Sequence, residues 1–373
     1  MDSVLFIFGT RPEAIKLAPV IKAFDQSKLF KSIVCTTGQH KEMLQQAIDF
    51  FKLNVDHQLD VMTTNQSLFG LTSKIINQLE PILADSKIKY VVVQGDTTTA
   101  FCGALAAYYA GKKVIHVEAG LRTWNKNSPF PEEINRALVG RIADLHFVPT
   151  EMAKNNLLME NVDPLKIFNV GNTVIDALNF TIENVNSQKT SAFEGFDGID
   201  FSKKIILITG HRRESFGQPF QNILESIKEL AEKFDQFQFI FPVHLNPIVK
   251  NHVEKVLANQ SNIFLLSPLP YELNIWLMSK CYLVITDSGG IQEEAPSLGK
   301  PVIVTREVTE RPEGVEAGVA KLVGHNKNLI ISEISQLIEN KHYYNSMATR
   351  KNPYGNGTSS QQIVSIVENL NSK

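Results

Sequence analysis

The segment that decides the fold runs from Asp287 to Arg311 and reads DSGGIQEEAPSLGKPVIVTREVTER. It follows the apolar run Tyr282 to Ile285, which is typical of a buried strand. The strand ends in a glycine-rich turn, and a helical pattern begins at once. Such a turn aims the unpaired N–H groups of a helix start, and the positive end of the helix dipole, at one point. The segment therefore predicts a phosphate site at the carboxyl end of a parallel strand.

Charged side chains within the segment extend this prediction to a nucleotide diphosphate. Glu293 and Glu294 fall in the first turn of the predicted helix, where carboxylates are favoured, and one of them could accept both hydroxyls of a ribose. Arg306 and Arg311 follow the next predicted strand, Val302 to Val304, and could return to the same rim. The alternative is an ordinary helix–strand connection with a glycine turn. Paired glycines, paired glutamates and trailing arginines together favour nucleotide binding.

Length and composition exclude several classes of protein. The chain has 373 residues, more than one hydrophobic core usually organises, so we expect two domains. The net charge of −2 argues against nucleic acid as a partner. Cys35, Cys102 and Cys281 lie among apolar neighbours and form no Cys-x-x-Cys pair, which is typical of a reducing compartment. Because no apolar run approaches the ~20 residues that span a bilayer, we expect a cytoplasmic protein without a membrane partner.

Short apolar runs alternate with helical patterns along the whole chain. Runs without polar alternation suit strands buried on both faces of a parallel sheet and joined by right-handed helical crossovers. The predicted strands are Val4–Phe8, Ile33–Thr36, Tyr90–Val93, Lys113–Val117, Leu145–Val148, Ile205–Thr209, Gln238–Phe241, Ile263–Leu266, Tyr282–Thr286, Val302–Thr305 and Ala320–Val323.

This order predicts an α/β fold with two doubly wound, Rossmann-like domains that face a cleft. We expect an N-terminal domain over residues 1–171 and a C-terminal, nucleotide-binding domain over residues 203–357. The polar stretch between them, residues 172–202, is interpreted as a hinge. A helical pattern over residues 358–373 follows a break at Asn352 to Gly355 and could pack on either domain.

Polar residues gather where the predicted strands of the first domain end. Arg11 and Lys16 follow the first strand, and Pro12 fits the first position of the next helix. The alternative is a solvated turn with a lysine on the helix surface. Asp96 follows the third strand and could be a helix N-cap, a catalytic group or both.

Further charged residues occupy similar positions. Glu118 closes a core strand, where a carboxylate is costly unless it has a partner or a function. Glu132 lies at a predicted helix start, where the dipole alone favours it, and Arg136 could be its i,i+4 partner. His211 and Arg212 follow the first strand of the second domain and suit an anionic ligand, although a surface charge run is the alternative.

Taken together, these segments resemble the bacterial non-hydrolysing UDP-N-acetylglucosamine 2-epimerases. The resemblance implies a GT-B fold, a C-terminal helix that crosses back onto the first domain, a homodimer, and neither a nicotinamide cofactor nor a metal. The lack of a dinucleotide fingerprint, a Walker loop or an evident metal-ligand cluster agrees with the last point. The matching segments are Gly9–Lys16, Gly38–His40, Gly95–Thr99, Val117–Thr123, Ser128–Arg136, Gly171–Leu178, Gly210–Gly217, Asp287–Thr305 and Thr309–Gly314.

The resemblance also implies individual roles. Catalytic roles fall on Asp96, Glu118, Glu132 and His211. Substrate-binding roles fall on Arg11, Lys16, Arg136, Ser288, Gly289, Gly290, Glu294 and Arg311. A second, regulatory sugar nucleotide would contact Gln39, Glu42, Arg212 and His244. Some family members carry an aromatic residue against the uracil at the position of Asn274, and in this chain Tyr271 lies nearby.

The implied activity is reversible epimerisation at C2 of UDP-N-acetylglucosamine to UDP-N-acetylmannosamine. UDP would be eliminated to give a glycal and then added back, and the product would supply activated N-acetylmannosamine for cell-surface polysaccharide. The carboxylates could act as general acid, general base or cation stabiliser, and which of them removes the C2 proton stays open. The alternatives are a glycosyltransferase on the same fold, a hydrolysing epimerase and a non-catalytic nucleotide-sugar sensor.

Overall fold

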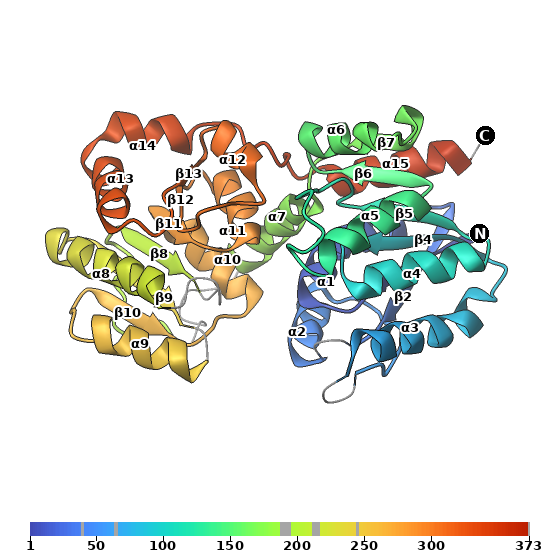
Figure 1. Ribbon diagram of the computed structural model, residues 1–373, viewed down its shortest axis with the longest axis horizontal. Helices are drawn as coiled ribbons and strands as arrows, with labels where there is room; N and C mark the ends of the chain where they lie inside the picture. Colours follow the sequence, from blue (N-terminus) through green and yellow to red (C-terminus); the bar gives the residue numbers. More distant parts are fainter. Residues whose placement is uncertain (39–40, 63–65, 187–194, 211–216, 244–245, 372–373) are drawn as a thin grey trace. The chain divides into compact units, whose positions relative to one another are not determined.

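The computed structural model describes residues 1–38, 41–62, 66–186, 195–210, 217–243 and 246–371. The chain forms two compact units (Figure 1), one with residues 1–177 and the chain from residue 354 onward, the other with residues 178–353. The sequence placed the first domain at 1–171 and began the second at 203. In the structure the chain leaves the first unit within a helix, after Ala177, and returns to it after Pro353.

The first unit is built on a parallel seven-stranded sheet of order β3-β2-β1-β4-β5-β6-β7. Its strands are β1 (Asp2–Phe8), β2 (Phe30–Thr36), β3 (His57–Gln58), β4 (Ile88–Gln94), β5 (Lys113–Val117), β6 (Leu145–Val148) and β7 (Ile167–Asn169). Its helices are α1 (Arg11–Asp25), α2 (Lys41–Phe51), α3 (Leu68–Leu83), α4 (Thr98–Tyr109), α5 (Glu132–Ile142), α6 (Glu151–Met159), the 3₁₀ turn Pro164–Lys166, the start of α7 (Thr173–Asn186) and α15 (Ser359–Asn371).

Two strands of this sheet were not predicted. β3 has two residues, which pair with Cys35 and Thr36 of β2, and β7 has three. Strands this short carry too few apolar residues to give a pattern. The central strands were predicted because their apolar runs are buried on both faces, and Val4 to Phe8 are fully buried.

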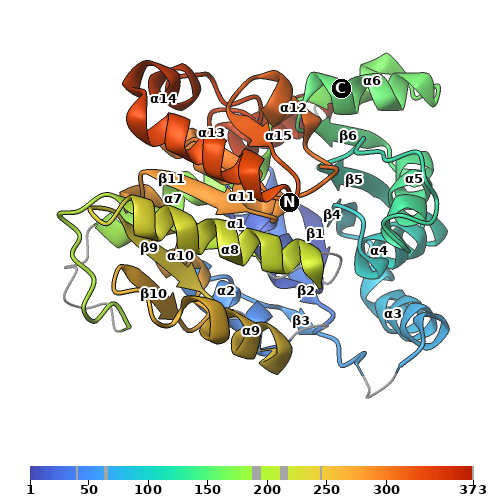
Figure 2. The same cartoon turned by 60° about the vertical axis from the view of Figure 1, so that its left-hand side comes forward.

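Helices cover both faces of the first sheet. Figures 1 and 2 show α3, α4 and α5 side by side, and α4 packs against both of its neighbours. The C-terminal helix α15 packs against α1, and Ser27 Oγ donates to Glu368 Oε1 over 2.6 Å. The end of the chain therefore lies in the first unit.

The second unit repeats the architecture with a parallel six-stranded sheet of order β10-β9-β8-β11-β12-β13. Its strands are β8 (Ile205–Thr209), β9 (Gln238–Pro242), β10 (Ile263–Leu266), β11 (Leu283–Thr286), β12 (Val302–Val304) and β13 (Ala320–Leu322). Its helices are α8 (Gln218–Lys233), α9 (Pro247–Leu257), α10 (Tyr271–Lys280), α11 (Gly289–Glu294), the 3₁₀ turn Ala295–Leu298, α12 (Pro312–Glu316), α13 (Lys327–Glu339) and α14 (Lys341–Ala348).

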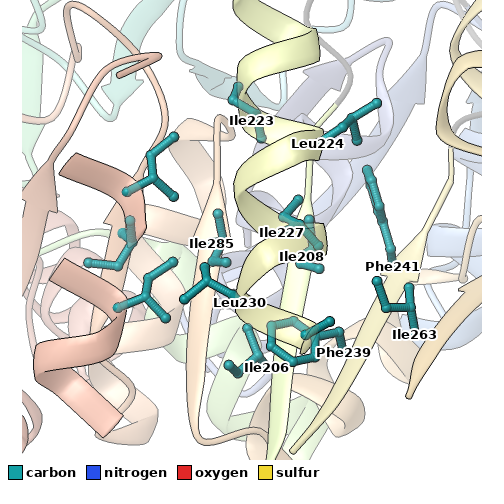
Figure 3. Close-up of a cluster of buried hydrophobic side chains, with 14 of the residues drawn as sticks. Ile206, Ile208, Ile223, Leu224, Ile227, Leu230, Phe239, Phe241, Ile263 and Ile285 are labelled. Atoms are coloured by element: carbon teal, nitrogen blue, oxygen red, sulfur yellow. The ribbon is translucent and has the colours of Figure 1, made fainter. Parts of the chain in front are cut away.

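Helix α8 shows how one apolar stripe organises the second core. Ile223, Ile227 and Leu230 recur at helical spacing and face the sheet, where they meet Ile208 and Phe239 (Figure 3). Removing each such side chain from water stabilises the fold by roughly 1.5–3 kcal/mol. In the described ranges, every helix is too short or too polar to cross a lipid bilayer.

Candidate active site

The loop after β1 is organised by a buried glutamate. Thr10 is the N-cap of α1, and Glu13 completes a capping box with it. The Glu13 Oε2 atom accepts from the backbone N–H groups of Gly9 (3.0 Å) and Thr10 (2.8 Å) and from the Thr10 hydroxyl (2.8 Å). The sequence predicted Pro12 at the first position of this helix. In the structure Arg11 is the first helical residue and Pro12 is the second. Arg11 is half-buried at this end of the sheet.

Glu118 is the centre of a buried hydrogen-bond network. Its two carboxylate oxygens lie 2.6 and 2.8 Å from Lys16 Nζ on α1. Oε2 also accepts from the side-chain amide of Gln94, the last residue of β4, and Oε1 accepts from Asn172 Nδ2 over 3.1 Å. The Glu118 side chain is 4% exposed, so this carboxylate has the partners that its burial requires.

The backbone at Glu118 is itself unusual. Glu118 directly follows β5 and has a φ of 60°, in the left-handed region that non-glycine residues rarely adopt. Such conformations cost of order 1–3 kcal/mol and cluster at functional sites. The surrounding hydrogen bonds hold the side chain in place despite this cost.

Asp96 lies in the loop after β4 and forms an ion pair with Arg136 of α5. The distance from Asp96 Oδ2 to Arg136 Nη2 is 2.5 Å. The N-cap of α4 is Thr97, whose hydroxyl accepts from the Ala100 N–H over 3.0 Å. The N-cap interpretation of Asp96 is therefore wrong, and its side chain is available for another role. Asn135 Nδ2 also donates to the Asp96 backbone carbonyl over 2.9 Å.

The spacing along the helix suggested that Arg136 pairs with Glu132. Among the described residues this pair does not form. The second partner of Arg136 is Glu133, at 3.3 Å, one turn earlier on α5. Glu133 is buried, and its carboxylate also accepts from the backbone N–H groups of Thr123 and Trp124. Glu132 is the first residue of α5, as predicted, and is half-buried.

The electrostatic environment of Asp96 favours its protonated form. Burial raises the pKa of the Asp96 carboxyl above its usual value, and the Arg136 guanidinium opposes this. The charges of Glu118 and Glu132 raise the pKa further. Carboxylates that share a site push their pKa values apart, so one can hold a proton while another stays ionised.

His116 of β5 contacts the backbone of the loop after β4, which carries Asp96. Burial lowers the pKa of His116 to about 3, so the ring is neutral at physiological pH. Its Nε2 atom lies 2.8 Å from the Gly95 carbonyl oxygen, which can only accept, so Nε2 carries the proton. This contact fixes the turn at Gly95, where φ is +67°, immediately before Asp96.

In the second unit, β11 leads into the start of α11 as predicted. Ser288 is the N-cap, and its backbone N–H donates to Thr286 Oγ1 over 2.9 Å. Within the part of the chain that the structure describes, a Cβ atom at Gly290 would meet nothing within 4 Å, and one at Gly289 would first meet the Arg311 guanidinium, at 3.9 Å. Arg311 thus returns to this turn, as expected.

The two glutamates of α11 lie in its last turn and not in its first, because the helix spans only Gly289 to Glu294. They are stabilised by side-chain partners. Glu293 is buried and pairs with Arg311. Glu294 Oε1 accepts from the Tyr271 hydroxyl over 3.0 Å. Tyr271 therefore orients Glu294, and its stacking on a base stays a prediction.

Four predicted site residues lie outside the described residues: the catalytic candidate His211 and the regulatory candidates Gln39, Arg212 and His244. The remaining regulatory candidate, Glu42, is exposed in the first turn of α2. Its role stays a prediction. Among the described residues no group of three metal-ligating side chains comes together.

The comparisons with known proteins agree with this geometry. The family model for UDP-N-acetylglucosamine 2-epimerase matches residues 22–368. The chain belongs to the UDP-N-acetylglucosamine 2-epimerase family. It is 48% identical over 373 residues to a UDP-N-acetylglucosamine 2-epimerase of Campylobacter jejuni, covering 98% of this chain and 97% of that one.

Solved structures of this family share the fold. The crystal structure of UDP-GlcNAc 2-epimerase from Neisseria meningitidis bound to UDP-GlcNAc superposes with a TM-score of 0.91 at 48% identity, covering 98% of this chain and 100% of that one. The enzyme from Methanocaldococcus jannaschii in complex with UDP-GlcNAc and UDP gives a TM-score of 0.81 at 36% identity, covering 98% and 99%. The GT-B architecture of these epimerases is thus the architecture of this chain.

Proposed function

We propose that the protein is a non-hydrolysing epimerase that interconverts UDP-N-acetylglucosamine and UDP-N-acetylmannosamine at C2. The observation that carries the proposal is the arrangement of Asp96 beside Glu118, each with its own cationic partner. It is supported by membership of the family and by the UDP-GlcNAc named in the complex of the Neisseria relative. A glycosyltransferase or a sensor would not need two such carboxylates.

We assign nucleotide binding to residues of the second unit. The start of α11 at Ser288 to Gly290 and the Arg311 guanidinium offer N–H donors to the diphosphate of the leaving UDP. The Glu294 carboxylate, oriented by Tyr271, accepts the ribose hydroxyls. We also assign Arg11 and His211 to the diphosphate, on the family resemblance alone.

We assign the chemistry at the sugar to residues of the first unit. The hydrogen on C2 is not acidic by itself. Departure of UDP develops positive charge at C1, and this charge makes the proton on C2 removable. Asp96, Glu118 and Glu132 then divide the roles of acid, base and cation stabiliser. The environment of Asp96 suits a group that changes its protonation during turnover, whereas Lys16 holds Glu118 as an anion. Protonation of the glycal on the opposite face and re-addition of UDP complete the reaction.

Incubation with UDP-N-acetylglucosamine alone in D₂O tests this function. We expect UDP-N-acetylmannosamine to form with deuterium at C2, because solvent returns the proton that was removed. NMR spectra of the mixture would show the two sugar nucleotides and the deuterium at C2. Free N-acetylmannosamine as the main product would instead indicate a hydrolysing enzyme, and no exchange at C2 would contradict epimerisation altogether.

Removal of the ribose contact should weaken nucleotide binding without touching the chemistry. Glu294→Ala is expected to reduce the affinity for UDP by about 1–3 kcal/mol, the range of charge-assisted hydrogen bonds. Calorimetric titration with UDP measures this loss. Glu254→Ala, which removes an exposed carboxylate from α9, serves as the matched control and should bind UDP normally. Equal affinity in the two variants would show that Glu294 does not hold the nucleotide.

We also propose that the protein works as a homodimer in the cytoplasm. Neighbouring helices of the first unit expose large apolar side chains: Phe69 on α3, Tyr108 and Tyr109 on α4, and Ile134 and Leu138 on α5. Large apolar side chains exposed on neighbouring helices favour a protein interface. Sedimentation should give the mass of a dimer, and Tyr109→Glu should give a monomer; a monomeric wild type would contradict this assembly. The three free, buried cysteines suit a reducing compartment.

A further inference from the structure

Asn172 occupies an unusual position between the catalytic network and the connections of the two units. It lies directly before α7, the helix within which the chain leaves the first unit. Its backbone N–H donates over 2.7 Å to the carbonyl oxygen of Tyr354, the first residue after the chain returns. The Asn172 side chain is buried, and it points its amide at Glu118.

The orientation of the Asn172 side chain is fixed by its neighbours. Its Oδ1 atom accepts from the backbone N–H of Val174 over 3.1 Å, which makes it the N-cap of α7. Because a backbone N–H can only donate, this contact identifies the oxygen, and the remaining Nδ2 atom must be the one that lies 3.1 Å from Glu118 Oε1. Asn172 is therefore a donor to the carboxylate and not an acceptor that competes for its proton.

The two crossing segments pack backbone against backbone at this point. Gly171 has a φ of +88°, and a Cβ atom there would lie 3.2 Å from Gly355 Cα. Asp176 on α7 accepts from the backbone N–H groups of Ser359 and Ser360, at 3.3 and 2.7 Å. The position of Asn172 is thus set by both of the places where the chain passes between the units.

We infer that Asn172 is a positioning residue, which holds Glu118 as an oriented anion and ties that carboxylate to the two crossing segments. The inference rests on the proposed catalytic role of Glu118. A hydrogen bond from a neutral amide to a carboxylate favours its ionised form. Movement of either crossing segment would displace this donor, so the ionisation of Glu118 depends on the conformation of the connection.

Several groups set the charge of Glu118 besides Asn172. Lys16 contacts it from α1, Gln94 donates to it from the end of β4, Asp96 acts on it from the loop after β4, and His116 lies on β5, the strand that directly precedes Glu118. Burial keeps His116 neutral. Loss of the donor at position 172 therefore removes one stabilising contact of the Glu118 anion, while the contacts with Lys16 and Gln94 remain.

Asn172→Ser tests the inference, because serine can still cap α7 but its hydroxyl is too short to replace the amide at Glu118. We expect turnover to fall about tenfold at neutral pH, the effect of one hydrogen bond to a charged group. The acid limb of the pH–turnover profile should move to higher pH by about one unit, because Glu118 then accepts a proton more readily. Asn326→Ser, at the N-cap of α13, is the matched control and should leave the profile unchanged.

Four measurements can overturn the inference in different ways. An unchanged acid limb and normal turnover in Asn172→Ser would make Asn172 a helix cap only. Asn172→Gly, which also lacks the amide and costs a cap only a few tenths of a kcal/mol, must show the same shift even if the serine variant folds poorly. Combined with Glu118→Gln, Asn172→Ser should cause no further loss. If Glu118→Gln alone keeps full turnover, the proposed role of Glu118 fails, and the assignment of Asn172 fails with it.

Discussion

Asp96→Asn is expected to lower turnover by roughly 10²-fold or more while leaving the affinity for UDP nearly unchanged. Proton transfer by a positioned side chain contributes about 10²–10⁴-fold to a rate. Asparagine has nearly the same size and can still accept from Arg136, so the fold and the ion-pair position are preserved. It cannot carry a proton, which is the property that burial and the neighbouring carboxylates favour in Asp96.

Glu118→Gln should show the same separation of turnover from binding. An amide at this position loses the charge that pairs with Lys16, although the donors from Gln94 and Asn172 remain nearby. Groups that act only in the transition state change turnover, whereas contacts to the nucleotide change affinity for substrate and transition state together. We therefore expect UDP to bind normally to this variant.

Calorimetry with UDP and C2 exchange by NMR on the same protein preparations would measure both quantities. Asp144→Asn provides a matched control, because Asp144 accepts from the Val114 N–H at the start of β5, whereas Glu118 follows the end of that strand. The control should keep normal turnover. Near-normal turnover in both Asp96→Asn and Glu118→Gln would mean that the two carboxylates are structural, and the proposed mechanism would be wrong.

Many strands of this protein could be predicted from their apolar runs. β5, β6, β8 and β10 begin and end at the predicted residues, although three of the four residues of β10 are only half-buried. β3 and β7 escaped prediction because two or three residues carry no period. The structure divides the chain after Ala177, inside α7, and a helix that continues through a division gives no break in the sequence to mark it.

Side-chain pairs are harder to predict from a sequence than positions along an element. Residues at the ends of strands could be proposed for the site because all parallel strands end at one edge of the sheet, and their roles stay predictions. The predicted partner of Arg136 was wrong. Helical spacing suggested Glu132, whereas the observed partner, Asp96, lies in a loop 40 residues away in sequence. Side-chain direction decides such contacts, and spacing along one element cannot supply it.

The neutral members of the network could not have been found by sequence reasoning. Gln94 and Asn172 carry no charge, and their partner Glu118 lies 24 and 54 residues away. A buried amide that donates to a carboxylate leaves the same local pattern as an amide in a solvated turn. Only the close approach of β4, β5 and the start of α7 distinguishes the two.

Glu13→Ala is expected to lower the free energy of unfolding of the first unit by roughly 3–5 kcal/mol, because several buried donors lose their acceptor. Glu13 is 1% exposed, and its Oε2 atom accepts from three donors at Gly9 and Thr10. Its Oε1 atom accepts from the Thr97 hydroxyl over 2.7 Å, so this one carboxyl joins the loops after β1 and β4. Each buried donor left without a partner costs about 1–3 kcal/mol.

Glu13→Gln should behave differently, because it imitates the protonated acid. Burial raises the pKa of Glu13, although its hydrogen bonds from Thr97, Thr10 and Gly9 oppose this. A carboxyl whose pKa is raised on folding contributes stability that is fully present below its unfolded pKa and is lost as the pH rises through its folded pKa. The glutamine cannot ionise, so the stability of the wild type relative to this variant should decrease as the pH increases.

Urea unfolding at several pH values, followed by circular dichroism, measures these differences for the two variants. Ser67→Ala is the matched control, because it removes an exposed N-cap acceptor from α3 and should cost about 1 kcal/mol at every pH. A loss in Glu13→Ala no larger than in this control would show that the buried carboxyl is not what holds the loops. A pH-independent difference between the wild type and Glu13→Gln would mean that Glu13 has the same proton affinity in the folded and unfolded chain. Because Arg11 begins the helix after the first of these loops and Asp96 lies in the second, Glu13→Gln should keep most of the turnover, and Glu13→Ala should lose it together with stability.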